Sequence, residues 1–122
     1  MNNIEKEQVI LGTLPSKSNS YKIITINGHS SLAKSAALKA YEKEFYLQCN
    51  KYRGMNYKGL FELYADVYFT SDRQDLDNAA KGLLDCLQIV KAIDNDRHCI
   101  GLYMRKFKDK NNPRVEFTIV KQ

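Results

Sequence analysis

Hydrophobic and polar residues alternate along several short segments of the chain, and this alternation predicts β-strands. The clearest segment is 60–70, because successive side chains of a strand point to opposite faces. Five of its apolar residues share one face, namely Phe61, Leu63, Ala65, Val67 and Phe69. The other face carries Glu62, Tyr64, Asp66 and Tyr68. Shorter segments of similar character predict four more strands, at 6–12, 21–27, 99–107 and 114–120.

Two longer segments repeat their apolar residues at helical spacing. The first is 30–49, with Ser30 or Ser31 placed to cap it. Its repeating residues are Ala33, Ala37, Ala40, Tyr41 and Phe45. The second helix begins at Asp75 and ends before a break at 93–96. On a helical wheel its core face spans about 120° and comprises Leu76, Ala80, Leu83, Leu84, Leu87 and Val90.

The order of these elements predicts the fold class. It is strand, strand, helix, strand, helix, strand, strand, with turn signals at Asn27-Gly28 and around Pro113. We therefore expect an α+β fold, in which two main helices pack on a small mixed β-sheet. A length of 122 residues suits a single domain, 1–122, with one core.

Composition places the chain among ordinary folded proteins, with 43% hydrophobic and 27% charged residues. No segment approaches the roughly 18 consecutive apolar residues that span a bilayer. The opening MNNIEKEQ lacks the apolar centre of a signal peptide. We expect a cytoplasmic protein that makes no contact with a membrane.

Three cysteines are present, Cys49, Cys86 and Cys99. Their odd number and their spacing match no disulfide framework and include no CxxC pair. With only His29 and His98 to add, a structural zinc site is a weak interpretation. We expect buried or partly buried free thiols, which suit a reducing compartment.

Positive charge is concentrated late in the chain. The net charge is +5 and the isoelectric point is near 9.1. The basic residues singled out as candidate DNA contacts are Lys91, Arg97, Arg105, Lys106, Lys108, Lys110 and Arg114. Taken alone, the segment 105–114 is more simply a solvated hairpin tip. Beside a cluster of carboxylates, it favours contacts with a phosphate backbone.

Carboxylates cluster at the start of the second helix, in DLDNAAKGLLD at 75–85. Asp77, Lys81 and Asp85 fall on one ridge of the helix, and Asp75 precedes its first turn. A cap would explain one of these acids, and Lys81 with Asp85 would make an ordinary surface pair. Two carboxylates that reach one point repel each other, however, unless a cation lies between them. Mg²⁺ fits, because it takes a few carboxylates and leaves water and phosphate oxygens to complete its shell.

A second acidic set, Asp94, Asn95 and Asp96, follows the helix. By itself it is most simply a polar loop. Because it lies at the far end of the helix from Asp75, the chain must turn back to bring the two sets together.

These residues resemble the RusA family of Holliday-junction resolvases, which are metal-dependent endonucleases that cut four-way DNA junctions. The family pattern is Asp-x-Asp-Asn-x-x-Lys at a helix start, an Asp four residues later, and an acidic pair before a strand. Here it corresponds to DLDNAAKGLLD and DNDRH. Upstream, LPSKSNSYK is similar to the N-terminal loop of the family, which contains proline and asparagine.

The resemblance implies roles for particular residues. Asp75, Asp77 and Asp96 would be catalytic carboxylates that bind Mg²⁺, for which Mn²⁺ can substitute, and Lys81 would be the catalytic lysine. Asn95 stands where the family has the first acid of the pair, so it keeps an oxygen ligand but loses a charge. Asp94 and Asn95 are therefore supporting candidates.

The resemblance also implies a homodimer that presents two sites to the symmetric strands of a junction. His98 stands where the family often has glutamine, and we expect it to be structural. Two other functions fit the residues alone. One is a non-catalytic basic DNA-binding module, and the other is an Asp-x-Asp phosphotransferase on small phosphoesters. The second usually needs a large helical cap, for which this chain has no room.

Overall fold

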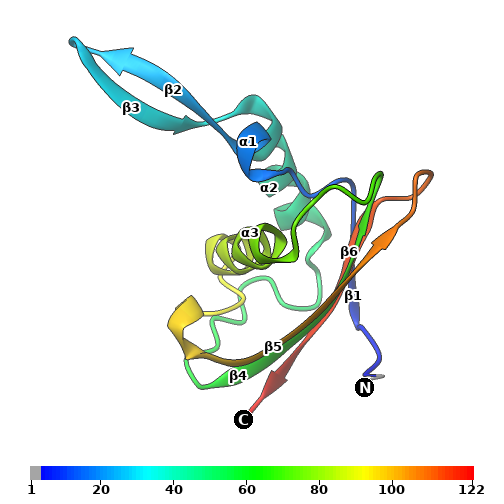
Figure 1. Cartoon of the computed structure of the whole chain (residues 1–122). Coiled ribbons are helices and arrows are strands. Elements are labelled where there is room, and N and C mark those ends of the chain that lie inside the picture. Colours follow the sequence, from blue (N-terminus) through cyan, green and yellow to red (C-terminus); the bar gives the residue numbers. More distant parts are fainter. Residues whose placement is uncertain (1–3) are drawn as a thin grey trace.

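The computed structural model describes residues 4–122, which form six β-strands, three α-helices and one short 3₁₀ helix (Figure 1). In chain order the elements are β1 Gln8–Leu11, α1 Lys17–Ser20, β2 Tyr21–Ile26, β3 His29–Lys34, α2 Ala36–Gln48, β4 Phe61–Phe69, α3 Leu76–Ile89, η1 Asp96–His98, β5 Cys99–Lys108 and β6 Arg114–Lys121. All five predicted strands are present, with ends that differ by one or two residues.

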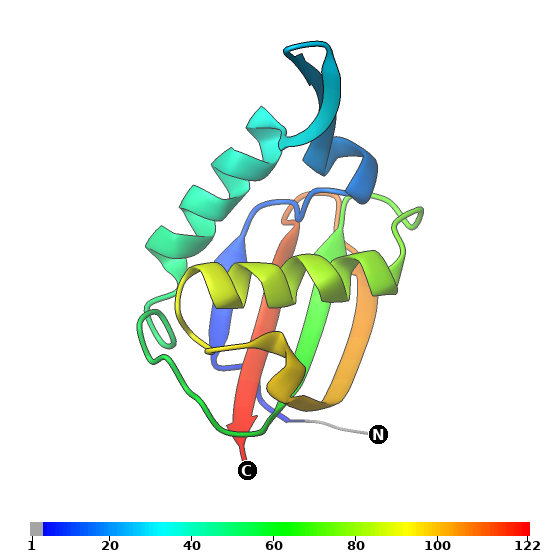
Figure 2. The ribbon, with the colours of Figure 1, turned by 90° about the vertical axis from the view of Figure 1, so that its left-hand side faces the viewer.

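The main sheet has four strands in the order β1-β6-β4-β5. Strands β4 and β5 run parallel, whereas β6 is antiparallel to both β4 and β1. Figure 2 shows α3 crossing the strands on one face of this sheet, with α2 on the same side. The predicted α+β fold, a mixed sheet with two main helices packed on it, is therefore confirmed.

The core lies between this sheet and the two helices. The alternation predicted for β4 is confirmed, because Phe61, Leu63 and Val67 are fully buried and point toward the helices. Leu83 and Leu87 of α3 are fully buried against them. Complete burial of such a side chain contributes about 1.5–3 kcal/mol, so this layer fixes α3 on the sheet and thereby fixes what α3 carries.

The predicted helix 30–49 is wrong in its first part. His29–Lys34 is a strand, β3, that pairs with β2 in a separate two-stranded hairpin. Asn27 and Gly28 both have positive φ, at 51° and 80°, and they form the two-residue turn that a tight hairpin requires. Local turn geometry therefore overrides the helical spacing of the alanines.

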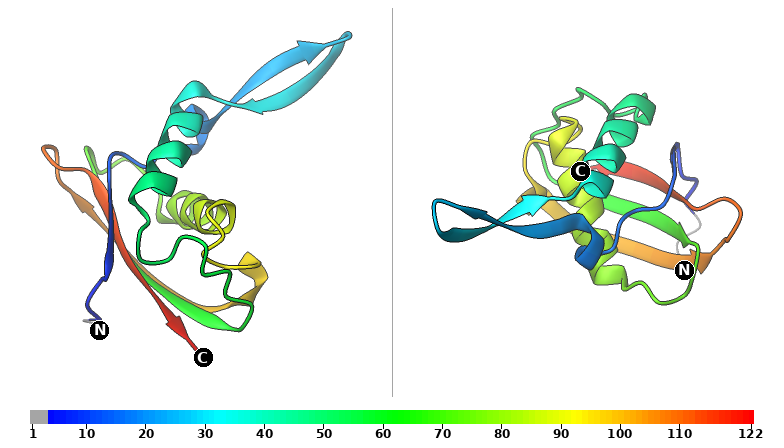
Figure 3. Two further views of the ribbon diagram at one scale, coloured as in Figure 1. Left: turned by 180° about the vertical axis from the view of Figure 1, so that it is seen from behind. Right: turned by 90° about the horizontal axis from the view of Figure 1, so that it is seen from above.

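Helix α2 starts only at Ala36, and its cap is Ser35 instead of Ser30 or Ser31. Its buried residues are Leu38, Tyr41 and Phe45, whereas Ala37 and Ala40 are exposed. The β2–β3 hairpin extends away from the sheet and the helices (Figure 3).

The core face predicted for α3 is largely confirmed. Ala80, Leu83, Leu87 and Val90 are buried, but Leu76 and Leu84 are only partly covered. Ala79 and Cys86 are buried in addition, so the buried arc is displaced to one side of the predicted one. This displacement leaves the ridge of Asp77, Lys81 and Asp85 clear of the core.

The three cysteines are free thiols, as expected. Cys49 and Cys86 are buried and Cys99 is half-buried. Burial raises the pKa of the Cys86 thiol to about 12, so the thiol stays protonated at neutral pH. Across residues 4–122, the structure contains no helix of the length and apolar character that crossing a membrane demands.

Candidate active site

The site begins where β4 ends and the chain turns into α3. Asp75 occupies the N-cap position of α3 with extended backbone angles, yet its side chain makes no capping hydrogen bond. Asp77 lies in the first turn, and its Oδ1 accepts the backbone N–H of Asn78 at 3.0 Å. Both carboxylates are exposed, at the end of the helix where unpaired backbone N–H groups leave partial positive charge. Capping, the simplest explanation for Asp75, is therefore not what its side chain does.

Lys81 links the two acidic sets. Its Nζ donates to Asp85 Oδ1 at 3.0 Å, one turn along α3, and lies 3.7 Å from Asp96 Oδ2. The chain after α3 turns back so that η1 lies alongside the helix (Figure 2). The backbone N–H of Asp96 then donates to Gln88 Oε1 at 3.1 Å. The return that the sequence required is present, and it brings Asp96 to the ridge of α3.

The charge state of Lys81 follows from these contacts. Its hydrogen bond with Asp85 and the nearby charges of Asp85 and Asp96 raise its pKa above the ordinary lysine value. Lys81 is thus protonated at neutral pH. With 70% of its side chain exposed, its ammonium group is a positive charge that a phosphate can approach.

The neighbours of Asp96 have other positions. Asn95 caps η1, because its Oδ1 accepts the backbone N–H of Arg97 at 3.0 Å. Asp94 is exposed and lines a separate hollow with Asp85 and Lys91. His98 is half-buried. Its Nδ1 is enclosed and has no hydrogen-bond partner among residues 4–122.

The carboxylates of this region do not form a complete metal cage within one chain. Among the described residues, no group of three or more His, Cys, Asp or Glu side chains lies close enough to hold a metal ion. Asp75 and Asp77 nevertheless present two exposed carboxylates at the start of α3, and neither forms an ion pair with a side chain that the structure describes.

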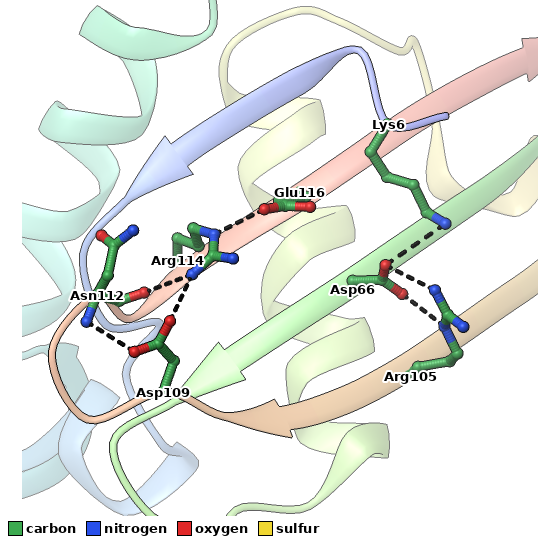
Figure 4. A network of polar contacts seen from close by, with 7 residues as sticks. All are labelled: Lys6, Asp66, Arg105, Asp109, Asn112, Arg114 and Glu116. Carbon is green, nitrogen blue, oxygen red and sulfur yellow. Dashed lines mark hydrogen bonds and ion pairs between the residues drawn. The ribbon is translucent and has the colours of Figure 1, made fainter. Parts of the chain in front are cut away.

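Two of the seven basic residues predicted to contact DNA are engaged within the fold. Arg105 makes a two-pronged bond to Asp66, with Nε at 2.8 Å and Nη2 at 2.9 Å (Figure 4). Arg114 donates to Asp109 at 2.9 Å and to Glu116 at 2.6 Å. Their charges are compensated by these carboxylates.

Lys106 bonds to backbone oxygens instead of a carboxylate. Its Nζ donates to the backbone oxygens of Asp72 at 3.2 Å and Gln74 at 3.0 Å. It therefore ties β5 to the loop that leads into α3, and so helps to position Asp75.

The remaining four cations are exposed and lack a carboxylate partner within residues 4–122. They are Lys91, Arg97, Lys108 and Lys110. Strands β4 and β5 run parallel, so Lys108 is paired with Phe69 at the strand end from which the chain continues toward Asp75. The basic turn after β5 is thus held beside the loop before α3, with the N–H of Asp109 donating to the oxygen of Phe69 at 2.7 Å.

Sequence reasoning missed the hollow beside Asp75. It is formed by the loop before α1, the base of the hairpin and the start of α3, and Tyr21 and Leu32 line it. The sequence does not predict this hollow, because its pattern predicts a helix over 30–34 and a helix there would not bring Leu32 toward Asp75. The loop with proline and asparagine that resembles the family's N-terminal loop does contribute to its wall.

Nearly the whole chain is similar to a known family of nucleases. A family model described as endodeoxyribonuclease RusA matches residues 14–120, nearly the whole chain. The protein is therefore of the nuclease class, a hydrolase that acts on phosphodiester bonds of DNA. It belongs to the RusA endodeoxyribonuclease family. A comparison with curated proteins finds no match.

Family membership supports a general role as an endonuclease that resolves Holliday junctions. It favours the nuclease over the two other functions that the residues alone allowed, a DNA-binding module without activity and a phosphotransferase on small phosphoesters.

Proposed function

We propose that this protein is a Mg²⁺-dependent endonuclease that resolves four-way DNA junctions by paired, symmetric nicks. The observation that carries the proposal is the approach of Asp96 to Lys81 on the ridge of α3 that begins with Asp75 and Asp77. A catalytic arrangement needs this approach, and a helix with a merely polar surface does not.

Carboxylate oxygens are the ligands that a hard divalent cation prefers, and Asp75 and Asp77 would hold such an ion at the start of α3. Asp96 would complete the set as the third carboxylate only when it moves from Lys81 toward the ion, whereas Asn95 caps η1 and Asp94 lines a separate hollow. Mg²⁺ usually takes few protein ligands, so an incomplete protein cage is compatible with it. When bound, such an ion supplies positive charge to the scissile phosphate and acidifies water, and Mn²⁺ can replace it.

Lys81 supplies the other charge at the site. Its ammonium group would contact a non-bridging phosphate oxygen, because it is exposed and protonated. Asp85 holds Lys81 by the hydrogen bond along α3. Asp96 would have to exchange Lys81 for the cation, or share the two, as DNA binds.

DNA would reach this site across the basic turn after β5. Lys108 and Lys110 are suited to phosphate contacts, since neither has a partner in the described chain, and Lys91 and Arg97 extend the surface from the other end of α3. Lys106, Arg105 and Arg114 would act mainly by shaping this surface.

Two copies are needed for paired nicks. A junction of four arms has two-fold symmetry, and a homodimer with the same symmetry places one site on each of two opposed strands. We propose a homodimer that acts in the cytoplasm.

The test compares two aspartates that are five residues apart. Asp77→Asn should lower Mg²⁺-dependent nicking of a synthetic four-way junction by a hundredfold or more, on the order of the loss of one essential charged group. Asp72→Asn, an exposed carboxylate on the loop before α3, should leave the rate unchanged. Equal cleavage by Asp77→Asn and the wild type would refute the proposed site.

A further inference from the structure

We infer that the hollow beside Asp75 receives one unstacked nucleobase of the junction, next to the phosphate that is cut, and reads its edge. This inference rests on the proposed function, because it takes the scissile phosphate to bind at Asp75 and Asp77. It adds a binding site for a base and a reason why this nuclease would select both a branched structure and a sequence.

The hollow has a suitable place and size. Its volume is about 870 Å³, and Asp75 itself is part of its wall. Sites for small organic ligands commonly have about 300–1,000 Å³. A phosphate bound through a cation at Asp75 and Asp77 would therefore place its attached nucleoside near the entrance of the hollow.

The walls favour a base over a phosphate chain. Leu14 and Phe69 form the deep part and are only 3% and 2% exposed, so the hollow ends on apolar surface. Tyr21 and Leu32, from the base of the hairpin, are at its mouth and are much more exposed. Among the lining side chains that the structure describes, Arg73 is the one cation. A phosphate chain needs several cations, whereas apolar and aromatic walls suit the flat faces of a base.

The rim offers polar groups that can read a base edge. The side-chain amides of Asn19 and Asn78 line the hollow, and neither makes a hydrogen bond to a group that the structure describes. Each amide can donate and accept, which is what the edge of a base presents. Arg73 likewise has no carboxylate partner in the described chain and can add two donors.

Such a site would favour a junction over a duplex. A base can enter the hollow only after leaving its stack, which costs a few kcal/mol in an intact duplex and less where stacking is already disturbed. The crossover of a four-way junction is such a place. The hollow would thus delay cutting of ordinary duplex and prefer the base that its amides fit.

The experiment uses the full-length protein and junctions that carry 2-aminopurine, a base whose fluorescence rises when it leaves the stack. The probe is placed in turn at each position flanking the crossover, with Ca²⁺ in place of Mg²⁺. We expect a rise of twofold or more at one position, next to the cut. Leu32→Ala and Asn19→Ala should each remove at least half of this rise, whereas Ile26→Ala should keep it. Ile26 is an exposed residue of the same hairpin and does not line the hollow.

A second readout is the distribution of cuts over a junction whose crossover can migrate. Leu32→Ala and Asn19→Ala should broaden this distribution, and Ile26→Ala should leave it as in the wild type. No fluorescence rise at any position, or a rise and a distribution that both variants preserve, would overturn the inference. If the wild-type protein does not cleave the junction with Mg²⁺, the proposed function is refuted. The fluorescence measurements, which need no cleavage, would still show whether the hollow binds a base.

Discussion

At the scale of single residues, a spacing predicts which side chains share a surface but not which partners meet them. The ridge of Asp77, Lys81 and Asp85 follows from helical geometry, and the bond from Lys81 to Asp85 confirms it. The approach of Asp96 depends on how the chain returns after α3, and a helical wheel carries no such information. In the same way, alternation along β4 gives the face of Asp66 but not its partners.

Asp66 shows what those partners do. Its side chain is only 8% exposed, on the face of the sheet that no helix of residues 4–122 covers (Figure 4). Arg105 binds it from β5, and Lys6 lies 3.5 Å away. Burial raises the pKa of the Asp66 carboxyl, but the hydrogen bonds and charges of Arg105 and Lys6 outweigh it and hold the pKa below its ordinary value.

Asp66→Asn should therefore lower the free energy of unfolding at pH 7 by about 2 kcal/mol, because it leaves Lys6 buried without a counter-charge. A depressed pKa contributes stability above the unfolded value of about 3.9, and this contribution disappears as the pH falls through the folded pKa. Urea unfolding should thus show a constant difference from the wild type at pH 5–7 and a smaller one below about pH 4. A difference that does not change with pH would contradict the ion pair as its source.

At the scale of elements, periodicity predicts strands and helices well where burial is continuous. It gives all strands of the main sheet and α3. It fails at 30–34 because Ala33 and the serines there are small and exposed or half-exposed, so no packing enforces the helical spacing. The Asn27-Gly28 turn decides the outcome. An Asn-Gly pair directly after a strand is a strong hairpin signal, and it outweighs the helical spacing of small residues that follow it.

Ser35 defines where α2 starts. Its Oγ accepts the N–H of Leu38 at 3.1 Å and donates to the backbone oxygen of Asn19 at 2.5 Å, so it joins the helix to α1. Ser35→Ala should lower the free energy of unfolding by about 1 kcal/mol, as measured by thermal or urea denaturation. Ser31→Ala, an exposed residue of β3, should change it by much less. Equal losses of stability in the two variants would instead indicate that the helix begins near Ser31, as the sequence alone predicts.

At the scale of the whole molecule, the distribution of charge matters more than the net value of +5. Part of the positive charge is neutralised within the fold, because Arg105 pairs with Asp66 and Arg114 pairs with Glu116. What is left for a polyanion is gathered on the turn after β5, beside the loop that leads to Asp75. Sequence alone could not separate these two groups of cations, because the separation depends on which carboxylates the sheet brings opposite them.

Junction binding should report this separation. Replacing Lys108 and Lys110 together by alanine should weaken binding. It should also make the negative slope of log K against log salt shallower by about 2, or roughly 0.9 for each lost phosphate contact. Replacing Lys39 and Lys43, exposed on α2, should leave the slope unchanged. The measurement is a fluorescence titration at several salt concentrations, and equal slopes for both double variants would show that the turn after β5 does not face DNA.

The central claim is tested most directly by the products formed from a four-way junction in which each strand carries its own label. With Mg²⁺ and the wild-type protein, we expect nicks at symmetric positions in two opposed strands and two duplex products whose nicks DNA ligase can seal. Removal of the metal by chelation should abolish both. Unpaired nicks in any strand, or cleavage that persists in the chelator, would contradict a metal-dependent enzyme that resolves junctions symmetrically.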